Sequence, residues 1–80
     1  MVLHVELLGK DLLLTPHAYE RMIERGISLE ELMNVLSSKD SYAFIQKNGR
    51  IRIGNDYIEA VLQLSGSVLY LVTVVKKKSE

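Results

Sequence analysis

The chain of 80 residues contains no cysteine and no tryptophan, and it has only one proline and one phenylalanine. Without cysteine, neither a disulfide bond nor a thiolate metal site can form. The two histidines, His4 and His17, do not have the HExxH spacing of a zinc site, so we predict no metal and no cofactor. The GxGxxG and Walker patterns are also missing, which argues against the common nucleotide-binding loops.

Long hydrophobic runs are missing too. Apolar runs such as Leu12–Leu14 and Leu69–Val72 fall far short of the roughly 20 residues that span a membrane, so we expect no membrane association. An acidic residue, Glu6, interrupts the first apolar positions, and no cleavage-site pattern follows it. A secretory signal is therefore not expected, and we predict a cytoplasmic protein.

Neither sign of charge is in excess, because ten lysines and arginines balance ten acidic residues. A dedicated duplex-DNA binder usually carries a strong basic excess, which this chain lacks. The one block of charge is Lys76–Lys78 near the C-terminus. It is typical of a solvated tail that protects a sheet edge, and the alternative is a contact with nucleic acid.

What the chain does have is hydrophobic residues, at 48% of its length, which is enough for one small core. Eighty residues form one domain, so we predict a single domain over residues 1–80. A chain of this size buries only about 60–65% of the surface that its unfolded form exposes, so the core is small.

Residues 14–32 predict two helices and the corner between them. Thr15 is a good N-cap, and Pro16 suits the first helical position of a helix over 16–25. Gly26 stands where a left-handed residue ends a helix. Ser28 and Glu31 then have the spacing of a capping box, which predicts a second helix over 29–36.

The second half of the chain predicts an antiparallel meander of four strands, over 42–46, 50–54, 57–64 and 68–75. The turn dipeptides between them are Asn48-Gly49, Asn55-Asp56 and Ser65-Gly66. Residues 2–8 predict a short strand or an extended arm, followed by a turn at 9–11.

With two-residue loops, one face of this meander collects mostly aliphatic side chains. They are Phe44, Ile51, Ile53, Ile58, Ala60, Leu62, Leu64, Leu69 and Leu71. We expect the two helices to pack on this face, which defines an α+β fold. The same register places Thr73 on the helix-facing side and Val74 on the opposite side, and it sets Arg52 directly opposite Glu59.

The opposite face is mixed, and nothing in the chain is left to cover it. One interpretation is a homodimer formed through this sheet face, and a second is an ordinary solvated surface. A third is a platform for an extended RNA strand, on which Tyr57 or Tyr70 stacks on bases while Arg50 and Arg52 bind phosphates.

The candidate chemistry lies on the first helix, where His17, Arg21 and Arg25 are spaced one turn apart and share a face. We predict His17 as the group that accepts a proton and Arg21 as the cation that holds a phosphate, which makes them the candidate catalytic pair. Arg25, Arg50, Arg52 and Tyr57 are candidate substrate-binding residues. The general acid is unassigned.

These residues also have structural interpretations. A buried hydrogen bond between His17 and Thr73 would tie the helix to the last strand. Arg21 and Arg25 would form ion pairs with glutamates around the helix corner, and such exposed pairs contribute about 0–1 kcal/mol each.

The same stretch resembles the signature of domain of unknown function 4258 (DUF4258). The match is carried by Leu14, Thr15, His17, Ala18, Arg21, Met22, Glu24, Arg25, Gly26, Ile27, Ser28, Glu30 and Glu31, with a weaker match at Val72-Thr73-Val74. The family's helix–helix–sheet order is similar to that of RelE-like and BrnT-like ribonuclease toxins. This resemblance implies an RNA-binding protein or a metal-independent endoribonuclease with an antitoxin-like partner. The alternative function is a non-catalytic module for dimerisation or partner binding.

Overall fold

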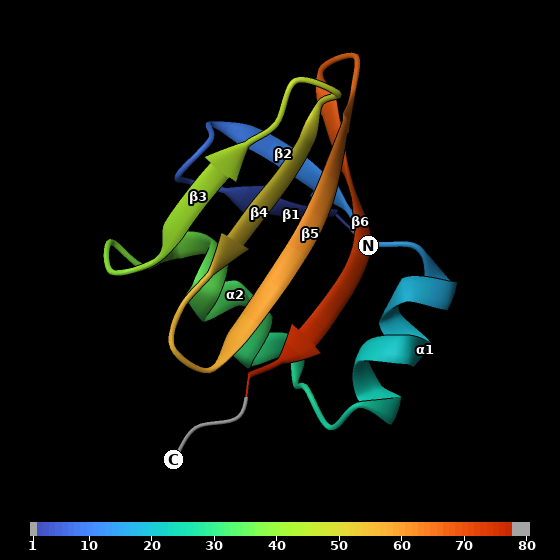
Figure 1. Ribbon diagram of the computed structural model, residues 1–80. Coiled ribbons are helices and arrows are strands. Elements are labelled where there is room, and N and C mark those ends of the chain that lie inside the picture. Colours follow the sequence, from blue (N-terminus) through green and yellow to red (C-terminus); the bar gives the residue numbers. More distant parts are fainter. Residues whose placement is uncertain (1, 78–80) are drawn as a thin grey trace.

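A six-stranded sheet and two helices make up the part of the chain that the computed structural model describes, residues 2–77 (Figure 1). In chain order the elements are β1 (Val2–Val5), β2 (Lys10–Leu13), α1 (Pro16–Glu24), α2 (Leu29–Ser37), β3 (Tyr42–Ile45), β4 (Arg50–Gly54), β5 (Ile58–Ser65) and β6 (Val68–Lys76). The α+β class is confirmed. The predicted tail begins at the end of β6, and Lys78 lies outside the described residues.

The sheet is mixed and has the strand order β1-β2-β6-β5-β4-β3. Its β3–β6 part is the predicted meander, but the prediction of only four antiparallel strands is wrong. The chain turns before Gly9, which has a φ of +63°, so Lys10–Leu13 is free to form β2. This strand pairs with β1 in a hairpin and with Val68–Tyr70 of β6 in parallel. A four-residue strand whose partner lies more than fifty positions away leaves little local signal.

Both helices begin where the sequence indicates and end within one residue of the predicted positions. The Thr15 hydroxyl accepts a hydrogen bond from the Ala18 amide at 3.2 Å and caps α1. Gly26 follows α1 with a φ of +72°, which an L side chain rarely adopts. Ser28 and Glu31 form the reciprocal bonds of a capping box at the start of α2, at 3.1 and 3.2 Å.

The core face of the sheet is as predicted except at β3 and near the end of β6. The Gln46 amide donates to the Arg50 carbonyl at 2.8 Å, so the loop has three residues, 47–49, rather than two. One extra loop residue turns β3 over, because side chains alternate between the faces of a strand. Phe44 therefore lies on the uncovered face, where it is 61% exposed.

The other two hairpins differ from the predicted register by two positions. Ile53 pairs with Ala60 rather than with Ile58, and Leu64 pairs with Leu69. A shift of two keeps each side chain on its predicted face, so the core face of β4 and β5 is unaffected.

A β-bulge in β6 changes the faces near the end of that strand. Val61 pairs with Thr73 and Leu62 pairs with Leu71, so Val72 is an extra residue. Val74 then points into the core and is 3% exposed. The prediction that Thr73 faces the helices and Val74 faces away is wrong, because the bulge inserts one residue into the alternation.

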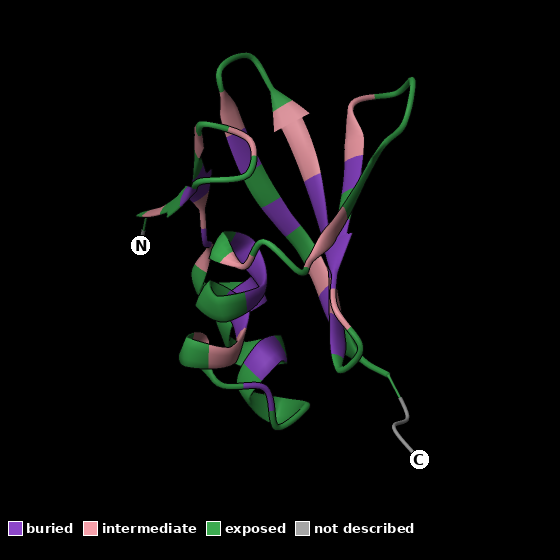
Figure 2. Ribbon diagram, turned by 90° about the vertical axis from the view of Figure 1, so that its left-hand side faces the viewer, coloured by how far each residue is buried: buried purple, intermediate pink, exposed green. Residues whose placement is uncertain are grey.

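The core lies between the sheet and the helices, which cover one side only (Figure 2). Leu12 and Val5 of the N-terminal hairpin are fully buried there, together with the aliphatic residues of β4, β5 and β6. Within residues 2–77, no helix is long and apolar enough to cross a membrane. Among the elements that the structure describes, none packs on the other side of the sheet (Figure 1).

Candidate functional site

The predicted catalytic pair lies on exposed positions of α1. His17 and Arg21 are both exposed, and neither side chain has a hydrogen bond or ion pair within residues 2–77. The helix contacts β6, beyond the point where β2 stops pairing with that strand (Figure 1). In this position the two side chains are available to solvent.

Arg25, the third member of the predicted stripe, turns toward the sheet. Its Nη1 atom donates to the Thr73 hydroxyl and to the Val74 carbonyl, both at 2.7 Å. Thr73 therefore accepts its bond from Arg25, and the predicted bond between His17 and Thr73 is wrong. The predicted ion pairs of Arg21 and Arg25 with glutamates are also not formed in the described part of the chain.

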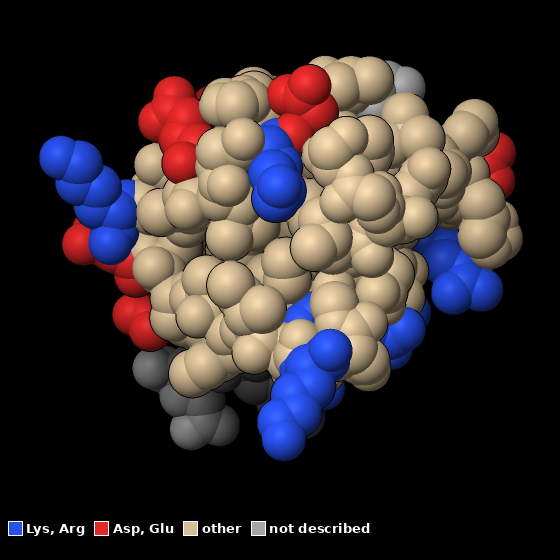
Figure 3. All heavy atoms as spheres, turned by 90° about the horizontal axis from the view of Figure 1, so that it is seen from above, with Lys and Arg blue, Asp and Glu red and all other residues tan. Residues whose placement is uncertain are grey.

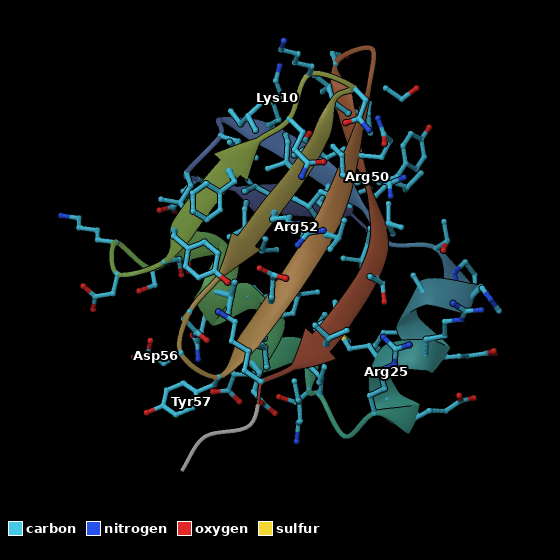
Figure 4. The ribbon with its side chains drawn as sticks, in the orientation of Figure 1. Lys10, Arg25, Arg50, Arg52, Asp56 and Tyr57 are labelled. Atoms are coloured by element: carbon cyan, nitrogen blue, oxygen red, sulfur yellow. The ribbon has the colours of Figure 1, made fainter. Side chains whose placement is uncertain are left out.

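The uncovered side of the sheet, which we call the outer face, gathers aromatic and basic side chains. The register aligns them in rows, because residues directly opposite on paired strands share a face. Phe44 lies opposite Arg52, and Arg52 lies opposite Val61. One row further on, Gln63 lies between Arg50 and Tyr70, and its side-chain oxygen is 3.4 Å from Arg50 Nε. Arg50 and Arg52 thus lie side by side on β4, facing solvent (Figure 4).

A polar network occupies the next row of the outer face. The Tyr42 hydroxyl donates to the Glu59 carboxylate at 2.8 Å, and Arg52 Nη1 lies 3.9 Å from the same carboxylate. The Lys77 amino group donates to the Tyr42 hydroxyl and lies 4.4 Å from the centroid of its ring. Arg52 thus pairs with the carboxylate and Lys77 is linked to it through the Tyr42 hydroxyl, so this network contains two cations and one carboxylate.

The ion pair between Arg52 and Glu59 forms as expected, but the two residues are not directly opposite. Glu59 pairs with Gly54, so Arg52 reaches it diagonally. Gly54 also makes room for the tyrosine, because a Cβ atom at this position would lie 2.6 Å from the Tyr42 hydroxyl. Sequence reasoning missed Tyr42, for which the only local signal was a glycine at the end of a predicted strand. It singled out Lys77 only as part of the Lys76–Lys78 block and did not place it beside a tyrosine.

Tyr57 lies apart from the outer-face arginines, in the turn between β4 and β5 (Figure 4). It is 65% exposed. Its ring borders an open depression of about 240 Å³, whose lining residues are Glu31, Asn34, Asn55, Tyr57 and Ile58. This lining has a carboxylate and two amides but no cation, so it differs in character from the outer face.

The six residues predicted for the site therefore fall into separate places. Arg50 and Arg52 share the outer face, Arg25 holds the edge of β6, Tyr57 lies at the end of a hairpin, and the remaining pair is on α1. Seen from above, Lys and Arg side chains project on several sides of the molecule, among them the lower edge and the right, and Asp and Glu lie at the left, the top and the right (Figure 3). In the described range 2–77, no three His, Asp or Glu side chains lie close enough to hold a metal ion.

Fold and surface together define a small α+β domain whose helices cover one face of a mixed sheet and leave a basic, aromatic face open. The family described as a domain of unknown function (DUF4258) has a model that matches residues 14–76. The chain belongs to this family, as its helical motif indicated. No curated protein and no solved structure matches the chain.

Proposed function

We propose that the protein binds single-stranded RNA on the outer face of its sheet. The observation that carries this proposal is the pairing of an exposed aromatic ring, Phe44, with a guanidinium, Arg52, on adjacent strands. Proteins that bind single strands commonly combine aromatic rings, on which bases stack, with cations that follow the phosphate backbone.

Two rings are available for stacking. Phe44 is 61% exposed and Tyr70 is 37% exposed, and they lie on strands at opposite sides of the β4–β5 pair. Strands in a sheet are about 4.8 Å apart, so three strand intervals separate the rings by roughly 14 Å or more. An extended strand crosses that distance in two to three nucleotides, which places a base on each ring with a phosphate between them.

The cations lie where those phosphates pass. Arg50 and Arg52 stand between the two rings, and Lys77 extends the same face toward the end of β6. Glu59 is the one carboxylate in this network, and it is already held by Tyr42 and Arg52. The chain as a whole has no net charge, so affinity depends on this local arrangement.

The proposal concerns binding, because the cleavage machinery expected from the sequence is not beside the outer face. His17 and Arg21 belong to α1, which flanks the helix-side edge of β6 rather than the rows around Arg52. The endoribonuclease activity stays a prediction, and binding on the sheet does not require it.

Fluorescence anisotropy with a labelled single-stranded RNA tests the proposal. Phe44→Ala and Tyr70→Ala each lose stacking worth about 1–3 kcal/mol, which is a loss of roughly 5-fold to 150-fold in affinity. Arg50→Gln and Arg52→Gln each lower the slope of log K against log salt concentration by about 0.7, because each removes one phosphate contact to a single strand.

Arg21→Gln is the matched control, since it removes the same charge from an exposed helix position. It leaves the affinity and the salt slope unchanged if RNA lies on the sheet. Absence of RNA binding by the parent protein, or an equal effect of Arg21→Gln and Arg50→Gln, contradicts the proposal.

A further inference from the structure

The strand β3 has a free edge whose only protection among the usual kinds is its short length of four residues. It is the last strand of the sheet and contacts only β4 among the described elements. In Figure 1 it forms the left-hand border of the sheet, with no element outside it. Its residues Tyr42–Ile45 include no proline and no charged side chain, and Phe44 and Ile45 are 61% and 70% exposed. Such an edge readily pairs with another strand.

The hydrogen bonds of the hairpin determine which backbone groups on this edge are free. The Gln46 amide bonds to the Arg50 carbonyl, so the even-numbered residues of β3 face β4. In an antiparallel pair these positions alternate with ones that point the other way. Ala43 and Ile45 therefore direct their N–H and C=O groups away from the sheet, toward solvent.

We infer that a second copy of this chain pairs with this edge, with the two β3 strands antiparallel about a two-fold axis at Phe44. This inference rests on the β3 edge and is independent of the proposed function. In this register Ala43 bonds to the partner's Ile45, and Ile45 bonds to the partner's Ala43. All of the outward backbone groups of these residues are then satisfied.

The side chains favour this register for two reasons. Phe44 meets the partner's Phe44 in a pair without backbone hydrogen bonds, where side chains approach most closely and two aromatic rings stabilise the contact. Ala43 has a small side chain, and it lies beside the larger isoleucine side chain of the partner's Ile45. The same arrangement places Lys47 opposite the partner's Ser41, next to the partner's Asp40, so no like charges are opposed.

The neighbouring register is less favourable. Centred on Ala43, it sets Lys47 opposite the partner's Lys39 and Ile45 opposite the partner's Ser41, and it separates the two phenylalanines. Registers shifted by one residue place outer-face side chains against core-face side chains, which a two-fold axis perpendicular to the sheet forbids. Of these two registers, the one centred on Phe44 is therefore favoured for self-pairing.

A charge swap at position 44 tests the inference, because only this position faces its own copy. The protein without RNA is examined by sedimentation equilibrium over a wide range of concentration. The parent chain doubles its mass as the concentration rises, whereas Phe44→Lys and Phe44→Glu each stay monomeric. An equal mixture of these two variants forms a one-to-one heterodimer, since Lys then opposes Glu.

Two further variants complete the experiment. Ile45→Pro removes an outward N–H without removing a bond to β4, and it also yields a monomer. Val72→Lys adds the same charge to a half-exposed site on another strand and leaves the dimer intact. Circular dichroism verifies that each variant is folded.

The inference is overturned by a parent chain that remains monomeric at every concentration. It is likewise overturned by dimers that survive Phe44→Lys, or by a mixture of the two charge variants that fails to associate. Loss of the dimer in Val72→Lys alone would instead assign self-association to the middle of the outer face.

Discussion

Arg25 joins the end of the first helix to the last strand by donating to the Thr73 hydroxyl and the Val74 carbonyl, both at 2.7 Å. Both acceptors lie on the part of β6 that has no strand beside it on that side, because β2 pairs only as far as Tyr70. The guanidinium therefore donates to a backbone carbonyl, that of Val74, which a neighbouring strand would otherwise satisfy. This is the role that the sequence suggested for His17.

Arg25→Ala should lower the free energy of unfolding by about 1–2 kcal/mol, because it removes two hydrogen bonds from a charged donor. Urea denaturation followed by circular dichroism measures the change. Arg21→Ala removes the same type of side chain one turn earlier and should change stability by less than about 0.5 kcal/mol. Equal effects of the two substitutions would show that the Arg25 contacts do not stabilise the fold.

The β-bulge predicts a large loss of stability at one valine and a small loss at another, although the two valines are separated by only one residue. Val74→Ala should cost about 2 kcal/mol, since it removes two buried methyl groups and leaves a cavity. Val72→Ala, at a half-exposed position, should cost less than about 0.5 kcal/mol. Thermal or urea unfolding of the two variants distinguishes this arrangement from an uninterrupted strand, in which both valines would lie on the outer face and both effects would be small.

Gly54 is required by close packing rather than by an unusual backbone angle. A methyl group there would lie 2.8 Å from the Tyr42 ring and 2.9 Å from the Ile58 carbonyl. Gly54→Ala should therefore cost about 2–3 kcal/mol through overpacking. The control is Gly66→Ala, where the space is open and only a φ of +64° opposes the substitution, at a cost of about 1–2 kcal/mol.

Adding Tyr42→Ala to Gly54→Ala separates the two clashes. The double variant should recover only part of the loss, because the Ile58 carbonyl stays in place. Complete recovery in urea denaturation would assign the whole effect to the tyrosine ring.

His17→Ala and Arg21→Gln should leave stability within about 0.5 kcal/mol of the parent chain, since both side chains are exposed and form no hydrogen bond or ion pair in the described residues. They are therefore clean probes of the predicted endoribonuclease chemistry. If the parent protein cleaves RNA, loss of cleavage in folded His17→Ala supports a catalytic histidine. Unchanged cleavage would show that the prediction for His17 is wrong.

Local features of the chain were sufficient to predict the helices. Thr15, Gly26 and the Ser28–Glu31 capping box act within one helical turn, so their effect does not depend on the rest of the fold. The aliphatic face of β4 and β5 was predictable for a similar reason. Its alternation is a property of each strand, and it survived a register error of two residues.

The site was harder to predict, because its members meet only through strand pairing. Arg52 and Glu59 were expected to interact, but Tyr42 and Lys77 join them from strands at distant points of the sequence. Spacing along α1 indicated a common face for His17, Arg21 and Arg25. That spacing did not indicate that the Arg25 side chain turns toward Thr73.

By itself, the sequence determined the α+β class, the ends of both helices and which side of β4 and β5 is apolar, because caps and alternation act over a few residues. Tertiary structure alone decided the parallel contact of β2 with β6, the reversal of β3 and the bulge at Val72. Each of these features depends on a single loop or inserted residue, and the local free-energy difference between the alternatives is small. The side chains that the sheet and helices bury together in the assembled fold therefore determine which alternative forms.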